Sequence, residues 1–246
     1  MYVKKTVECC GEIEVTKFYG GMFGNHSERK PKNECAKTCR RVEKNNFRMT
    51  ARNLYNLFRE NFSEGDSHLS LTYAKGTMSD VKAANKEVSK FLRKLRDWCK
   101  KNDVICKYIW NTDVSESGKI HHHIVLPKEI PMHIVNKLWQ RGKVIFNNAL
   151  FPNNDFYGLA EYFIDPTHKG TLPDIHTPGG KRYKCSKNLR RPKTTYEIIR
   201  SDRWKPEPRA PKGYCIKPDS LYNSIDERSG YPYQHYILIK QSKRRF

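Results

Sequence analysis

The segment Lys119–Leu126, with the sequence KIHHHIVL, constrains the fold of this chain more than any other stretch. A short polar turn, Ser115–Gly118, comes just before it, and the apolar segment Val104–Asp113 precedes that turn. Two extended segments joined by a tight turn predict an antiparallel hairpin. Because side chains alternate between the two faces of a strand, we expect His121 and His123 to project from the same face.

The predicted hairpin also brings an acidic side chain to the two histidines. Residues equally distant from a hairpin turn face one another, so Asp113, or alternatively Glu116, is expected beside His121. Imidazole and carboxylate groups together form the usual ligand set for Mn, Fe, Zn or Mg. The pattern therefore predicts a metal site made by His121, His123 and Asp113, with hydrogen-bonded packing histidines as the alternative.

The charge of the chain indicates its class of partner. The 246 residues include 47 Lys and Arg against 26 Asp and Glu, a net charge of +21. Such an excess favours a polyanion, because Lys and Arg release the counterions condensed on phosphates. No apolar stretch approaches the roughly 20 residues that span a bilayer, and no signal peptide or lipidation pattern is seen, so we expect a cytoplasmic protein without membrane contact. Its eight cysteines are then expected to be reduced thiols.

The remaining elements follow from apolar periodicity and from turn residues. Strands are predicted at Gly11–Tyr19, Leu69–Ala74 and Lys143–Phe146, and one or two basic helices at Glu34–Phe62. Further helices are predicted from a cap at Ser79 or Asp80 to Lys100, at Pro131–Trp139 and at Tyr157–Phe163. Gln234–Lys240 alternates and is expected to close the sheet as an edge strand.

These elements suggest three regions within one structural domain. Residues 1–66 form an N-terminal strand and a basic helical region packed on the core, residues 67–170 form the core, and residues 171–246 form a basic, aromatic extension that returns to the sheet.

The C-terminal extension has the composition of a surface for single strands. Lys181–Lys217 holds thirteen Lys and Arg against three acidic residues, interleaved with tyrosines and a tryptophan. Basic side chains that follow phosphates, beside aromatic rings on which bases stack, are typical of single-strand binding, although a tail draped over the domain is an equal alternative. The predicted DNA-binding residues are Lys181, Arg182, Lys184, Arg190, Arg191, Arg203 and Trp204.

The order of these segments resembles the rolling-circle replication initiators of the HUH endonuclease superfamily, in particular the compact initiators of Gram-positive plasmids, integrative elements and related phages. His-x-His alone is a weak motif, whereas the ordered series covers most of the chain. The segments that carry the resemblance are LSLTYA, FLRKLRDW, YIWNTD, GKIHHHIVL, LWQRGKV, YGLAEYF, YKCSKNLRRP and GYPYQHYILI.

The resemblance implies an α+β fold: a central antiparallel sheet of about five strands with flanking helices, akin to an RNA-recognition fold. It also implies an enzyme in which His121, His123 and Asp113 hold one Mg²⁺ or Mn²⁺. Tyr162 would attack a phosphodiester of single-stranded or supercoiled DNA at a replication origin, forming a 5′-phosphotyrosine and a free 3′-OH primer. No Walker A motif is present, so a separate helicase would unwind the DNA.

One position departs from the family pattern. The family usually carries a lysine three residues after the tyrosine, where this chain has Asp165. Lys169 lies further along and could replace it if the chain folds back after Pro166. The departure also leaves Tyr157 as a second candidate nucleophile.

Two other functions fit the same residues. The chain could be a non-catalytic, basic protein that binds single-stranded nucleic acid, with structural histidines. It could also be a mobilisation relaxase or a single-strand transposase of the same superfamily, which differ in substrate and not in chemistry. The sequence does not indicate an oligomeric state.

Overall fold

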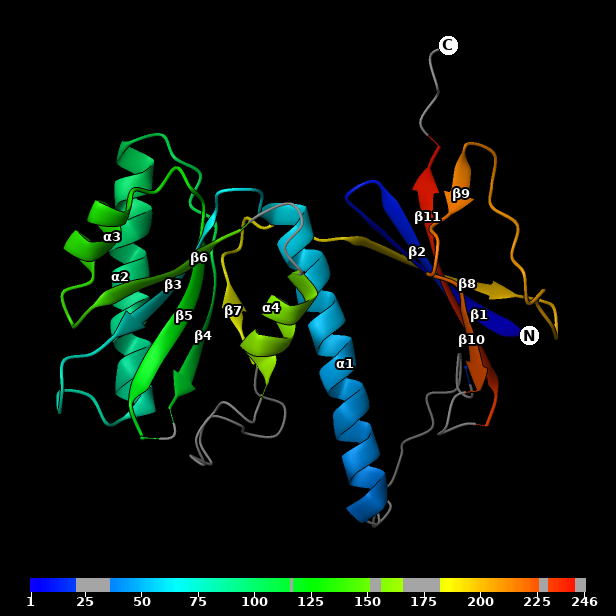
Figure 1. Ribbon diagram of the computed structural model, residues 1–246, viewed down its shortest axis with the longest axis horizontal. Helices are drawn as coiled ribbons and strands as arrows, with labels where there is room; N and C mark the ends of the chain where they lie inside the picture. The colour runs from blue at the N-terminus through cyan, green and yellow to red at the C-terminus, as the bar shows by residue number, and fades with distance from the viewer. Residues whose placement is uncertain (21–35, 116, 151–155, 166–181, 226–229, 242–246) are drawn as a thin grey trace. The chain divides into compact units, whose positions relative to one another are not determined.

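The computed structural model describes residues 1–20, 36–115, 117–150, 156–165, 182–225 and 230–241, with the side chains of residues 36–46 left out. The described chain falls into two units (Figure 1). One unit is Ala36–Arg190 and contains the histidine hairpin. The other joins Met1–Cys35 to Arg191–Phe246. This division differs from the predicted boundaries after residues 66 and 170, because the chain ends pair with each other and the long N-terminal helix packs with the hairpin unit.

The unit Ala36–Arg190 is built on a five-stranded antiparallel sheet in the order β6-β3-β5-β4-β7. The prediction of an α+β fold with a five-stranded antiparallel sheet is therefore confirmed. In chain order the elements are α1 (Ala36–Asn61), β3 (Ser67–Thr72), α2 (Val81–Lys101), β4 (Ile109–Val114), β5 (Ile120–Leu126), α3 (Met132–Leu138), β6 (Val144–Ala149), α4 (Phe156–Ile164) and β7 (Lys184–Cys185).

The central hairpin has the predicted pairing. Strands β4 and β5 are antiparallel, and Asp113 pairs with His121 while Asn111 pairs with His123. Gly118 in the connecting turn has a φ of 76°, a left-handed conformation that glycine adopts without a steric penalty. Short strands and a tight turn thus set the register that brings Asp113 to the histidines.

Each face of this sheet is covered by a different pair of helices (Figure 1). On one face, α2 and α3 pack on Leu69, Trp110 and Ile124. On the other face, α1 and α4 pack on Ile109 and Val125. Since side chains alternate along β5, His121 and His123 share the second face with Val125, so they lie on the side of α4.

The other unit holds a second antiparallel sheet. Its path is β10-β11-β2-β1-β8, and β9 pairs with β11. The strands are β1 (Tyr2–Cys9), β2 (Glu12–Phe18), β8 (Lys193–Ile199), β9 (Tyr214–Ile216), β10 (Tyr222–Ile225) and β11 (Pro232–Lys240). Val15, Tyr236 and Leu238 form its buried cluster.

The prediction that the C-terminal segment returns to the histidine sheet is wrong. β11 pairs with β2 on one side and with β9 and β10 on the other, so it is an internal strand of a different sheet. Its alternating pattern correctly indicated a strand, but such a pattern does not specify a partner strand. The strand β1 was also missed by the sequence analysis.

Most other elements agree with their predicted positions. Glu34–Phe62 was predicted as one or two helices, and α1 is a single helix of 26 residues. Asp80 caps α2 by accepting hydrogen bonds from the backbone N–H groups of Lys82 and Ala83. β6 extends three residues beyond its predicted end at Phe146. None of the helices in the described ranges is long and apolar enough to cross a membrane.

Candidate metal centre

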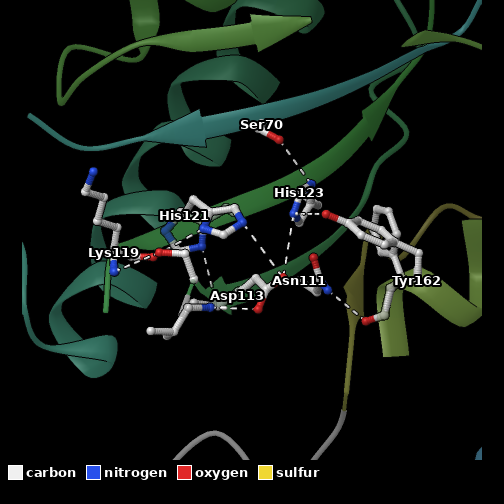
Figure 2. A network of polar contacts seen from close by, with 12 residues as sticks. Ser70, Asn111, Asp113, Lys119, His121, His123 and Tyr162 are labelled. Atoms are coloured by element: carbon white, nitrogen blue, oxygen red, sulfur yellow. Dashed lines mark hydrogen bonds and ion pairs between the residues drawn. The ribbon is translucent and has the colours of Figure 1, made fainter. Parts of the chain in front are cut away.

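Three potential ligands from the hairpin gather on the face that α4 covers (Figure 2). Nε2 of His121 and Nε2 of His123 each lie 3.8 Å from Oδ2 of Asp113. The three ligand atoms all lie within 4.8 Å of one another. Asp113 and His123 are buried, and His121 is partly exposed, so the cluster is open to solvent on the His121 side. The predicted grouping of these three residues is therefore present in the structure.

Hydrogen bonds orient each of the three side chains. Oδ1 of Asp113 accepts a hydrogen bond from the backbone N–H of Val114 at 2.7 Å, which leaves Oδ2 toward the imidazoles. Nδ1 of His121 lies 3.3 Å from the carbonyl oxygen of Lys119. A ring that donates from Nδ1 presents the lone pair of Nε2, which is the form that a metal ion needs.

The donor set fits a divalent ion. Ions bound at about 2.1 Å need ligand atoms about 3 to 3.5 Å apart, so small side-chain rotations would bring these three atoms to bonding distance. Nearby, Oδ1 of Asn111 is buried and has no hydrogen-bond partner among the described residues. Two imidazoles, one carboxylate and a further unsatisfied oxygen suit Mn²⁺ or Mg²⁺ better than a site of thiolates would.

A tyrosine hydroxyl reaches the same cluster from α4. Oη of Tyr162 lies 2.9 Å from Nε2 of His123, the atom that also faces Asp113 (Figure 2). A phenol that donates to Nε2 places the imidazole proton on Nδ1, where Oγ of Ser70 at 3.1 Å can accept it. Burial, and secondly the negative charge of Asp113, raise the pKa of Tyr162 above its ordinary value.

The end of α4 is tied to the hairpin. Nδ2 of Asn111 donates a 2.7 Å hydrogen bond to the carbonyl oxygen of Phe163, which neighbours Tyr162 in the sequence. Arg182 donates to the carbonyl oxygen of Ile164 at 3.1 Å. Both contacts satisfy carbonyl groups that the last turn of a helix leaves without partners, and they position Tyr162 relative to the sheet.

The second candidate nucleophile has a different environment. The ring of Tyr157 packs edge-on against Tyr55 of α1, with ring centres 5.7 Å apart. Tyr157 and Tyr162 are five residues apart, which separates them by about 140° around a helix. Burial, and secondly the charge of Glu161, raise the pKa of Tyr157. Of the two, Tyr162 is the tyrosine whose contact with a histidine of the cluster is seen.

The middle histidine of the segment has a structural environment. His122 is fully buried on the opposite face, where its ring nitrogens lie 2.8 Å from the hydroxyl of Tyr73 and 3.0 Å from that of Thr112. Burial, followed by the charges of His121 and Lys184, lowers the pKa of His122 to about 3. It is therefore neutral at pH 7 and acts as a hydrogen-bonded core residue.

The sequence analysis missed the residues that support His123 from β3 and β6. Nδ1 of His123 lies 3.2 Å from Nε2 of His68 and 3.1 Å from Oγ of Ser70. Burial lowers the pKa of His68 to about 4, opposed by its hydrogen bond to Asn148, so this imidazole is neutral. The alternation of His68 and Ser70 was a usable signal, but the predicted strand began one residue too late, at Leu69.

The predicted DNA-binding residues do not form one described group. Arg182, Lys184 and Arg190 belong to the unit with the histidines, whereas Arg191, Arg203 and Trp204 belong to the other unit. Lys184 is exposed and its ammonium lies 4.9 Å from the centre of the Trp110 ring.

The ring of Trp204 is not open for stacking on both faces, because it contacts Tyr2 and Tyr19 with ring centres 4.9 and 5.1 Å away. The DNA-binding role of the whole set stays a prediction. Lys181, the alternative ligand Glu116 and the possible replacement lysine Lys169 lie outside the described residues.

One comparison with known proteins relates the core of this unit to a family. Residues 66–169 match the model of a family described as "Replication-associated protein", of the ORF2 type. The matched segment contains the hairpin, all three candidate ligands and Tyr162, and it confirms the resemblance to replication initiator proteins. No curated protein and no solved structure matched the chain.

Proposed function

Since residues 66–169 match this replication-associated protein family, we propose that the chain is a rolling-circle replication initiator with HUH-type nicking and joining chemistry. In this proposal the protein acts in the cytoplasm of a bacterial host on single-stranded or supercoiled origin DNA, and a separate helicase unwinds the duplex. The observation that carries the proposal is the 2.9 Å contact between Tyr162 and a histidine of the candidate metal centre.

His121, His123 and Asp113 would hold the divalent ion, Mg²⁺ or Mn²⁺. When bound, such an ion supplies positive charge that polarises the scissile phosphate and stabilises the departing oxygen. The protein's own contribution is rigid placement, since two ligands come from one strand and the third from its hairpin partner.

Tyr162 is the proposed nucleophile. A phenol with a raised pKa is a weak nucleophile at neutral pH, so it must lose its proton as it attacks. The bond from Oη to phosphorus forms while the bond from phosphorus to the 3′ oxygen breaks, and the 3′ oxygen gains a proton. The phosphotyrosine conserves the phosphodiester, so the reverse reaction can rejoin strands without ATP.

The decisive experiment is a covalent-adduct assay. The chain is incubated with Mn²⁺ and with supercoiled DNA of the element that encodes it, and the denatured reaction is separated by size. We expect a protein–DNA adduct that is absent with Tyr162→Phe and present with Tyr157→Phe, the matched control on the same helix. An adduct that survives Tyr162→Phe but is lost with Tyr157→Phe would transfer the role to Tyr157.

The same assay separates the alternative functions. A non-catalytic binding protein would give no adduct with any variant, and its salt-sensitive DNA binding would be indifferent to Tyr162→Phe. A relaxase or single-strand transposase would form the adduct on transfer-origin or transposon-end DNA in place of a replication origin.

A further inference from the structure

A pocket of about 560 Å³ lies beside Tyr162, between β6 and α4, within the range of small-molecule binding sites. It belongs to the unit Ala36–Arg190, and none of the candidate metal ligands lines it. Its walls combine aromatic, apolar and amide groups: His68, Asn147, Asn148, Leu150, Phe156, Gly158, Leu159 and Tyr162.

A β-bulge places two amides at this pocket. Along β3 and β6, His68 pairs with Asn148 and Leu69 pairs with Phe146, so Asn147 is an extra residue in β6. Neighbouring residues of a regular strand point to opposite faces, but here both amides contact His68. Oδ1 of Asn148 lies 3.1 Å from Nδ1 of His68, and Nδ2 of Asn147 lies 3.3 Å from its Nε2. Bulges re-aim side chains in this way beside functional sites.

The two amides differ in what they can offer to a ligand. Asn147 exchanges hydrogen bonds with Ser70 at 2.9 and 3.2 Å, so its side chain is held by the protein. Asn148 is exposed and uses Oδ1 toward His68, while its amide N–H groups have no protein acceptor in the part of the chain that the structure describes. Asn148 can therefore donate to an acceptor atom inside the pocket.

The pocket is connected to the proposed nucleophile through two imidazoles. Asn148 contacts His68, His68 contacts His123 at 3.2 Å, and His123 contacts Tyr162 at 2.9 Å. Tyr162 itself is part of the pocket wall. A group in the pocket would thus lie beside the hydroxyl that the proposed function assigns to phosphodiester attack.

From this geometry we infer that the pocket binds one unstacked nucleobase of single-stranded DNA, next to the phosphodiester that Tyr162 attacks. The identity of the ligand rests on the proposed function, and the basic charge of the chain supports it independently. Aromatic and apolar walls contact the faces of a flipped base, and an amide reads its edge, as in other sites that extract a base from a strand. Gly158 presents only backbone to the pocket, which leaves room for the ring.

Binding to base-bearing and abasic oligonucleotides tests the inference without any cleavage. The probes are fluorescein-labelled 12-nucleotide strands of dA, dC and dT, and an abasic strand of the same length, measured by anisotropy in EDTA at constant salt. Gly158→Leu fills the pocket, and we expect it to weaken the tightest base-bearing strand by about fivefold or more. Binding of the abasic strand is expected to be unchanged. Gly158→Ala, which adds a single methyl group, should have a smaller effect.

A folded Gly158→Leu protein that loses both kinds of strand equally, or neither, overturns the inference. If that variant shows no cooperative thermal transition, Asn148→Ala decides. We expect it to weaken the tightest base-bearing strand by about two- to tenfold and to spare the abasic strand, and equal effects on both again overturn the inference. Because no metal ion or cleavage is involved, failure of the adduct assay and failure of this assay are separate results.

Discussion

The hydroxyl oxygen of Tyr162 lies 2.9 Å from Nε2 of His123, the same nitrogen that faces Asp113 in the candidate metal centre. One nitrogen lone pair cannot both accept this hydrogen bond and bind a metal ion. The metal-free arrangement is therefore one in which the proposed nucleophile is held at the site that the ion would take.

Removing that hydroxyl should tighten metal binding. We expect Tyr162→Phe to bind Mn²⁺ about two- to tenfold more tightly than the unsubstituted protein, since one hydrogen bond no longer competes for Nε2. Calorimetric titration measures the difference, and Tyr157→Phe is the control that should leave the affinity unchanged. Weaker binding by Tyr162→Phe would show instead that the phenol contributes to holding the ion.

Loss of a ligand should separate metal binding from DNA binding. We expect His123→Ala and Asp113→Asn each to weaken Mn²⁺ binding by more than about 100-fold and to abolish adduct formation. Binding of a single-stranded oligonucleotide in EDTA should largely persist, because the basic surface is intact. The exposed His133 on α3 provides the control His133→Ala, for which neither measurement should change. Equal loss of both activities in His123→Ala would indicate a structural histidine.

The link between Asn111 and α4 should contribute to stability and to placement of Tyr162. Asn111→Ala removes the buried 2.7 Å hydrogen bond to the carbonyl oxygen of Phe163. We expect the free energy of unfolding to fall by about 1 to 3 kcal/mol in urea titrations, together with slower adduct formation. The exposed Asn136 bonds only within its own helix, so Asn136→Ala should have a smaller effect on both. A wild-type adduct rate in Asn111→Ala would show that α4 is positioned by other contacts.

The buried neutral histidines should make the unit less stable in acid. Burial lowers the pKa of His68 to about 4 and that of His122 to about 3, whereas both titrate near 6.5 in the unfolded chain. Below pH 6.5 the unfolded state therefore binds more protons than the folded state, so stability falls as pH falls. Each histidine contributes a slope of up to about 1.4 kcal/mol per pH unit, which ends near its folded pKa.

Urea unfolding in EDTA, followed by tryptophan fluorescence at several pH values, measures this slope. Trp98, Trp110 and Trp139 report on the histidine unit, and Trp204 on the other. His122→Asn keeps a polar partner for Tyr73 and Thr112, and its slope between pH 4 and 6.5 should be shallower. The same steep slope in both proteins would assign the acid sensitivity to other groups.

The hairpin and its three candidate ligands could be predicted from the sequence because they depend on local geometry. The period of two along a strand places His121 and His123 together, and a short turn fixes Asp113 opposite His121. The period of two also puts Asn111 on the face of Asp113, a signal that the sequence analysis did not use. These relationships span fewer than fifteen residues, so no distant pairing had to be known.

The partners of the hairpin could only be seen in the tertiary structure. The support of His123 by His68 joins residues 55 apart in the sequence, and its contact with Tyr162 joins residues 39 apart. The bulge that turns Asn147 toward the site depends on how β6 registers with β3. Amphipathic patterns predict that an element has a buried face, but many partners can cover such a face.

The sequence by itself therefore determined the α+β class, the histidine hairpin and its candidate ligand set, through alternation, turn chemistry and charge. The tertiary structure alone decided that Tyr162 meets His123 and that β11 joins β2 in a second sheet. The physical reason is that local rules set which way a side chain points, whereas contacts between distant segments depend on the packing of the complete chain.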